Sequence, residues 1–182
     1  MDALTALQTR TSSPRLVDPA PEGAALEAIL KAGLRAPDHA MLRPWRFLLI
    51  SGEAREKFGQ LLVDALQPEG DDKRRKMLES PLRAPLLIVG VATVKEDKGI
   101  PRIEQVNSVA AALQNMSVAI YAQGFGAIWR TGQAAHDPRV KQALGLQEHD
   151  EIVGYLYVGT PTVTDRPAPE HAIEDYVQVW QG

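Results

Sequence analysis

The sequence contains no cysteine. This absence excludes a disulfide framework, a thiolate nucleophile and any metal site built on thiolate ligands. Only four histidines are present, and none is spaced from another as paired metal ligands usually are. We therefore expect no protein-bound metal. The four are His39, His136, His149 and His171.

Long apolar runs and an excess of positive charge are also missing. The longest apolar run, 85–94, has the length of a strand and is too short to span a membrane. The first ten residues lack the apolar stretch of a secretory signal, so we expect a cytoplasmic protein. The formal net charge of −3 creates no overall basic field, so we expect no binding to nucleic acid or to a membrane surface.

The length and composition suit one domain that spans residues 1–182. Hydrophobic residues make up 45% of the chain, which is enough for a substantial core. The spacing of apolar residues, and the glycines and prolines at helix ends, predict strands and helices in mixed order. The predicted strands are 45–51, 86–93, 125–129 and 151–158, and the predicted helices are 4–7, 21–36, 52–66, 101–123 and 138–144.

Two segments are predicted to lie outside these elements. The stretch 68–76 is polar and charged, and we expect it to be mobile. The tail from residue 163 is polar and rich in proline, yet its end carries apolar side chains. We expect that end to pack against another surface, such as a second subunit. The apolar residues are Tyr176, Val177, Val179 and Trp180.

The most informative segment is 34–50, where a helix end passes through a rigid, polar turn into a buried strand. Pro37 and Pro44 restrict the backbone on either side of Asp38, His39 and Arg43. Side chains held in this way are well suited to contact a ligand. We predict that part of a binding site is built at this turn.

Several familiar catalytic motifs are absent. The sequence has no P-loop, no dinucleotide-binding glycine motif after a strand, no nucleophile elbow and no zinc-protease motif. Candidates for anion binding remain. Arg10, Thr11, Ser12 and Ser13 combine a guanidinium with three hydroxyls just past a helix end, which suits a phosphate, although a solvated loop has the same composition. Arg35 and His39 can add a cation and a donor, or can be an ordinary helix-end charge and a surface histidine.

A second candidate segment follows the predicted strand 125–129. Trp129, Arg130, Thr131 and Gly132 can frame a planar ring with an aromatic edge, a cation and backbone amides. The alternative is a core tryptophan followed by a turn that ends the strand. The residue types alone do not decide between them.

Five segments match one family in order and in spacing. On these segments the chain resembles the nitroreductase superfamily, and specifically its small bacterial NAD(P)H nitroreductases. The resemblance covers nearly the whole chain. The matching segments are 10–12 after the first helix, the turn 35–45, the start of the long helix at 101–105, and the stretches 122–132 and 152–161.

The resemblance implies an α+β fold, with a mainly antiparallel central sheet flanked by helices. It also implies a homodimer that binds FMN at the subunit interface. By this likeness Arg10, Thr11 and Ser12 hold the phosphate and ribityl end, while Arg35 and His39 contact the flavin. Trp129, Arg130 and Thr131 line the cofactor as well. The stretch that resembles a nicotinamide nucleotide site comprises Ala119, Ile120, Tyr121, Ala122, Gln123 and Gly124.

The implied activity is that of an FMN-dependent NAD(P)H oxidoreductase with a ping-pong mechanism. A hydride passes from the nicotinamide to flavin N5, and the flavin then reduces a nitroaromatic, a quinone or a similar acceptor. This chemistry requires no catalytic side chain and no metal. Two alternatives stay open: a non-redox or flavin-consuming member of the superfamily, such as a dehalogenase or a flavin-fragmenting enzyme, and a flavin-free interaction protein.

The sequence departs from the family pattern at Thr11, where the commoner pattern has a second arginine. The replacement removes a positive charge beside the implied phosphate. Arg166 resembles a C-terminal basic residue that contacts the phosphate in larger members, so it is a further candidate.

Overall fold

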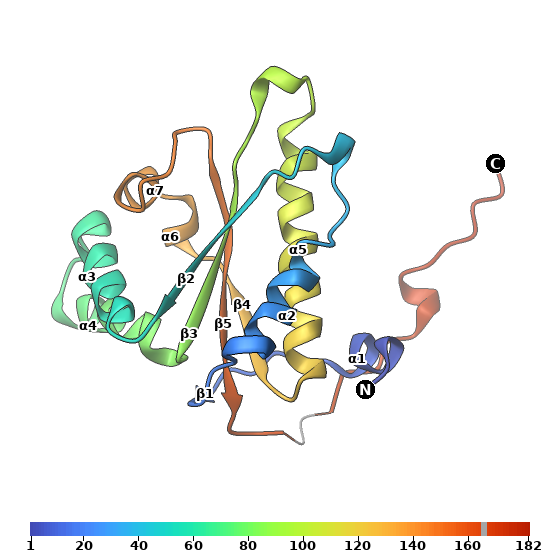
Figure 1. Cartoon of the computed structure of the whole chain (residues 1–182), viewed down its shortest axis with the longest axis horizontal. Coiled ribbons are helices and arrows are strands. Elements are labelled where there is room, and N and C mark those ends of the chain that lie inside the picture. The colour runs from blue at the N-terminus through green and yellow to red at the C-terminus, as the bar shows by residue number, and fades with distance from the viewer. Residues whose placement is uncertain (165–166) are drawn as a thin grey trace.

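The computed structural model describes residues 1–164 and 167–182, with Asp97 described in its backbone only. A five-stranded antiparallel sheet forms the centre of the described chain (Figure 1). The strands follow the order β1-β5-β3-β2, and β4 pairs with β5. Every ladder is antiparallel, which confirms the expected sheet. The strands are β1 (Leu16–Val17), β2 (Trp45–Ser51), β3 (Leu86–Ala92), β4 (Gly126–Arg130) and β5 (Glu151–Pro161).

Helices cover both faces of the sheet (Figure 1). Helix α2 (Gly23–Gly33) and the long helix α5 (Arg102–Ala122) pack on one face, with α1 (Ala3–Thr9) against α5. The other face is covered by four helices. These are α3 (Ala54–Leu66), α4 (Asp71–Glu79), α6 (Gln133–His136) and α7 (Pro138–Ala143). Short 3₁₀ turns complete the described chain: η1 (His39–Met41), η2 (Ser80–Arg83), η3 (Glu96–Lys98) and η4 (Ile173–Asp175).

Strand β3 lies between β2 and β5 and is buried at every position. Successive strand side chains point to opposite faces, so this apolar strand supplies both cores. Leu87 and Val89 belong to the core under α3, whereas Leu86 and Ile88 belong to the core under α5. The predicted central, fully apolar strand is therefore confirmed.

Two glycines allow α5 to approach its neighbours closely. A Cβ built on Gly33 of α2 would lie 2.2 Å from the Cε of Met116, and one on Gly90 of β3 would lie 2.7 Å from a methyl of Leu113. Larger residues at these positions would push α5 away from α2 and from the sheet. Helix α5 ends at Ala122, and Gly124 follows two residues later with a φ of +83°, which confirms the glycine predicted to stop the helix.

The prediction that 68–76 lies outside the helices and strands was wrong, because most of it folds into α4. Asp71 and Asp72 occupy the first turn and Lys76 the last turn, which favours the helix dipole. The helix has a narrow apolar contact with the core through Met77. Two apolar side chains, Met77 and Leu78, after a run of six charged residues give too weak a periodic signal to predict a helix.

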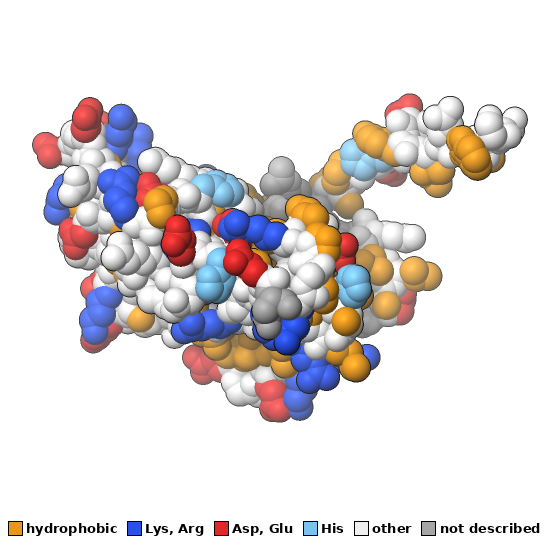
Figure 2. Space-filling model, turned by 90° about the horizontal axis from the view of Figure 1, so that it is seen from above, with side chains coloured by type: hydrophobic (Ala, Val, Ile, Leu, Met, Phe, Trp, Pro, Cys, Tyr) orange, Lys and Arg blue, Asp and Glu red, His pale blue; other side chains and the backbone are white. Residues whose placement is uncertain are grey.

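The C-terminal tail leaves the body of the molecule after β5 (Figures 1 and 2). Its apolar side chains are exposed, with Trp180 88% accessible in the single chain. The expectation that they pack against another surface stays a prediction. No helix among the described residues is long and apolar enough to cross a membrane.

Candidate functional site

The first candidate segment, residues 10–13, follows α1 in the sequence and lies beside the start of β4. Arg10 caps α1, and its backbone N–H donates to the carbonyl of Ala6. The N–H of Ser13 donates to the carbonyl of Ala127 at 2.9 Å, which fixes the segment to β4. The residues that follow Arg10 in the sequence line a cavity of about 160 Å³. It is lined by Thr11, Ser12, Ser13, Pro14, Arg15 and Val163.

A glycine makes this contact between the segment and β4 possible. A Cβ built on Gly126 would lie 2.8 Å from the Oγ of Ser13 and 2.9 Å from a methyl of Leu16. Any larger residue at 126 would displace the hydroxyl-bearing segment. The predicted anion-binding residues therefore sit on a backbone that the sheet edge holds in place.

The second candidate segment ends β4 and borders a larger cavity of about 500 Å³. Trp129 and Arg130 are neighbours in a strand, so their side chains point to opposite faces of the sheet. Trp129 packs against the core on the α5 side, whereas Arg130 lies near Tyr157 on the α3 side. The cavity lining is Phe58, Leu62, Ser80, Arg83, Trp129, Arg130, Thr131, Gly132, Ala134, Tyr155 and Tyr157.

The electrostatics of this larger cavity are positive. Arg83 and Arg130 belong to its lining, and no Asp or Glu is found among the described lining residues. The guanidinium carbon of Arg130 lies 5.8 Å from the centre of the Tyr157 ring. Its Nε is buried without a hydrogen-bond partner in the described part of the chain. A buried donor in this state is costly unless a ligand or water satisfies it.

Two buried tyrosines form the β5 side of the cavity. Burial raises the pKa of Tyr157, and the guanidiniums of Arg130 and Arg83 act in the opposite direction. Burial also raises the pKa of Tyr155, whose hydroxyl donates to the carbonyl of Ala134 at 3.1 Å. Both side chains are therefore neutral phenols at neutral pH.

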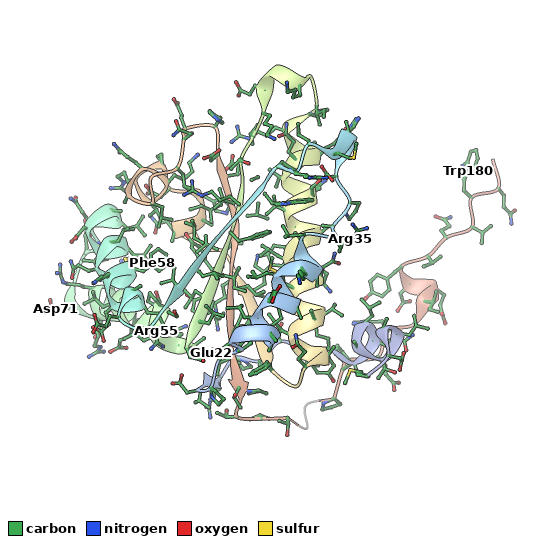
Figure 3. The ribbon with its side chains drawn as sticks, viewed as in Figure 1. Glu22, Arg35, Arg55, Phe58, Asp71 and Trp180 are labelled. Carbon is green, nitrogen blue, oxygen red and sulfur yellow. The ribbon has the colours of Figure 1, made fainter. Side chains whose placement is uncertain are left out.

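The turn that carries Arg35 and His39 lies elsewhere. Arg35 follows the end of α2, on the opposite side of the sheet from Phe58 of the larger cavity (Figure 3). His39 is exposed, and its Nδ1 lies 2.6 Å from Oε2 of Glu104 at the start of α5. Neither Arg35 nor His39 is among the described residues that line the two cavities.

The predicted nucleotide stretch lies at the C-terminal end of α5. Ile120 is fully buried in the core, so its side chain does not face solvent in the single chain. Ala122, Gln123 and Gly124 are exposed. The hydroxyl of Tyr121 donates to Thr9 at 3.1 Å, which places this end of α5 beside the Arg10 segment. Arg166 lies outside the described residues.

The predicted site residues thus lie in three places of one chain. The Arg10 and Trp129 segments adjoin opposite ends of β4, and the Arg35 turn lies across the sheet from the larger cavity. Sequence reasoning missed the lining residues from α3, η2 and β5, namely Phe58, Leu62, Ser80, Arg83, Tyr155 and Tyr157. Only the two tyrosines had a usable signal, since they alternate in a predicted strand and so share a face. Within the described residues no cluster suited to a metal ion occurs.

The sequence is similar to those of known proteins from one family. The model of the nitroreductase family matches residues 7–160. One relative is YdjA of Escherichia coli K12, which is named as an NAD(P)H nitroreductase. It is 47% identical over 163 residues, which are 88% of this chain and 89% of YdjA. A similarly named protein of Haemophilus influenzae is 35% identical over the same shares of the two chains.

Solved structures show the same fold. A nitroreductase-like family protein of Bacillus cereus has a TM-score of 0.85 at 24% identity, covering 100% of this chain and 97% of its own. A nitroreductase-type protein of Desulfovibrio desulfuricans, solved in complex with FMN, has a TM-score of 0.75 at 21% identity, covering 100% and 99%. The fold predicted from the sequence is confirmed.

Proposed function

This chain belongs to the nitroreductase family, and from that premise we propose that it is an FMN-dependent NAD(P)H oxidoreductase. The family match contains each of the three groups of predicted FMN contacts. Bound FMN would accept a hydride from NAD(P)H at N5 and pass electrons to an acceptor such as a nitroaromatic or a quinone. The residues of the chain would bind and orient the reactants.

The observation that carries this proposal is the pair of cavities at the two ends of β4. The cavity at the start of β4 is lined with hydroxyls from the residues that follow Arg10 in the sequence. The cavity at the end of β4 is lined with aromatic rings and two arginines. Four strand steps separate Gly126 from Arg130, about 13 Å. FMN has an anionic end and a planar ring joined by a flexible polyol. The two cavities therefore suit its two ends, with the strand edge between them.

The proposed roles follow from the chemistry of each group. Arg10 would pair with the phosphate, because a guanidinium offers two parallel donors to phosphate oxygens. The hydroxyls of Thr11 and Ser12 would donate to the same end. Arg130, whose buried Nε lacks a partner among the described residues, would donate to the ring and balance negative charge on it. Ala119–Gly124 is retained as the proposed nicotinamide nucleotide segment.

The position of Arg35 and His39 supports a site shared by two chains. They lie across the sheet from the larger cavity, so within one chain they are remote from a ring bound there. A second copy related by two-fold symmetry can bring its own turn to the cavity. We therefore propose a homodimer in which each FMN contacts both chains.

Initial-rate kinetics test this proposal. NAD(P)H oxidation should require FMN and an added nitroaromatic or quinone acceptor, and double-reciprocal plots should give parallel lines, as expected for a ping-pong reaction. Protein stripped of FMN should be inactive and should recover when FMN is added back. Intersecting lines would exclude the ping-pong mechanism. Turnover that does not depend on flavin would contradict the proposed cofactor.

A further inference from the structure

The turn between Pro37 and Pro44 has an unusual backbone. Ala40, Met41 and Arg43 have φ values of 52°, 53° and 49°. Residues with a Cβ rarely adopt this left-handed conformation, because it costs free energy relative to the usual regions. Such conformations persist only where surrounding contacts hold them, and they concentrate at functional sites. Three of them within four residues indicate a turn whose shape depends on the contacts that hold it, among them the Arg43 N–H, which donates to the Asp38 carboxylate at 2.5 Å.

The start of α5 supplies much of that restraint. Gln105 is buried, and its side chain accepts from the N–H of Lys95 at 2.9 Å and donates to the carbonyl of Ile100 at 3.0 Å. Lys95 in turn donates from Nζ to the carbonyl of Leu42 in the turn at 2.7 Å. One side of the turn is thus tied to α5 through Lys95.

Glu104, the neighbour of Gln105 on α5, holds the other side of the turn through His39. Its Oε2 lies 2.6 Å from Nδ1 of His39. An ionised carboxylate can only accept, so the proton of this hydrogen bond belongs to Nδ1. The contact therefore fixes the orientation of the imidazole ring and leaves Nε2 available. The His39 and Glu104 side chains are 57% and 45% exposed, so a second chain can reach the pair.

We propose that Glu104 is a positioning residue that holds His39 so that its Nε2 meets the flavin. This inference rests on the proposed function, in which His39 contacts FMN bound with a second chain. An isolated surface contact needs no strained turn around it. Here the hydrogen bond between His39 and Glu104, the link through Lys95 and the flanking prolines all restrain the one turn that carries His39.

The test measures FMN affinity of the stripped protein by fluorescence titration in a set of variants. The set comprises Glu104→Ala, Glu104→Gln, His39→Ala and the double variant His39→Ala with Glu104→Ala. Glu27→Ala is the matched control, since Glu27 pairs with Lys31 at the same 2.6 Å on the surface of α2. Circular dichroism and sedimentation confirm that each variant keeps its fold and assembly.

We expect Glu104→Ala to weaken FMN binding about fivefold, the upper range for an exposed ion pair. Glu104→Gln should restore most of the affinity, because its amide oxygen still accepts from Nδ1. In the His39→Ala background, Glu104→Ala should have no further effect, because its action passes through His39. Glu27→Ala should leave FMN affinity unchanged.

An unchanged affinity in Glu104→Ala, or an equal loss with and without His39, would overturn the positioning role. The proposed function has a separate criterion in the same titrations. If FMN binds and Arg10→Ala weakens it while Glu104→Ala does not, only the positioning role fails. If the unmodified protein binds no FMN, both fail.

Discussion

Gly154 of β5 lies directly against Trp129 of β4: a Cβ built on Gly154 would come within 1.9 Å of the indole Nε1. The glycine leaves room for the indole, which packs against the core on the α5 side of the sheet. The position of Trp129 thus depends on the absence of a side chain at Gly154 in the neighbouring strand.

Gly154→Ala should displace Trp129 and destabilise the protein by about 1–3 kcal/mol, as overpacking of a core does. Chemical denaturation with tryptophan fluorescence measures the loss. The double variant Gly154→Ala with Trp129→Ala provides the control, because removing the indole relieves the clash. The two effects should therefore be strongly non-additive. Simple additivity would show that Gly154 does not make room for Trp129.

Arg10→Ala should leave the fold intact and weaken FMN binding. Loss of a charge-assisted contact to phosphate costs about 1.5–3 kcal/mol, or about ten- to a hundredfold in dissociation constant. Arg10→Lys should restore only part of the affinity, since it keeps the charge without the planar fork. Titration with FMN measures the effect, and Arg46→Ala on the edge strand β2 is the control for loss of an exposed arginine.

Riboflavin, which lacks the phosphate, makes the Arg10 experiment specific. Its weaker binding should change far less than that of FMN in Arg10→Ala. Equal losses for the two flavins, or no loss for FMN, would assign the phosphate to other cations, with Arg35 and Arg166 next to be tested.

The buried tyrosines predict a loss of stability at alkaline pH. Burial raises the folded-state pKa values of Tyr155 and Tyr157 above the unfolded value of about 10. The resulting stabilisation is complete below pH of about 10 and is lost as the pH rises towards the folded values. Urea midpoints measured between pH 8 and 12 should therefore fall above pH of about 10. Tyr155→Phe should make that fall shallower, and an identical fall in this variant would remove Tyr155 from the explanation.

Deletion of residues 173–182 should weaken the proposed dimer. The segment carries exposed apolar side chains, including Trp180 at 88% accessibility, and burying one large apolar side chain contributes about 1.5–3 kcal/mol. The dimer dissociation constant should rise at least about tenfold. Sedimentation equilibrium of full-length and shortened chains measures this change. A monomeric full-length protein that still holds FMN would contradict the shared site.

The sequence predicted the fold where the pattern was local and strong. The alternating or continuous apolar runs of β2, β3 and β5 and the glycine that ends α5 were placed within a few residues of their observed bounds. Helix α4 was missed because its apolar contact is narrow and all its residues except Met77 and Leu78 are charged. Only some of the residues that line the larger cavity were predicted from the sequence. Trp129 and Arg130 share a local segment, but Phe58, Ser80 and Arg83 come from other elements and have no sequence pattern in common.

The contact between His39 and Glu104 shows why such a site exceeds local reasoning. The two residues are 65 positions apart and meet only because α5 packs beside the turn after α2. The residues of the turn predict part of a binding site, whereas the start of α5 is indicated only by the family resemblance. Their pairing depends on tertiary structure, which periodicity and spacing do not encode.

The central claim is that this chain is a flavin enzyme reduced by a nicotinamide, and an anaerobic visible spectrum tests it most directly. The purified protein should show the absorbance bands of bound flavin, and NADH or NADPH should bleach them rapidly. Admission of a nitroaromatic or quinone should restore the bands. Protein that neither carries nor takes up FMN, or bound flavin that NADH and NADPH leave unbleached, would contradict the account.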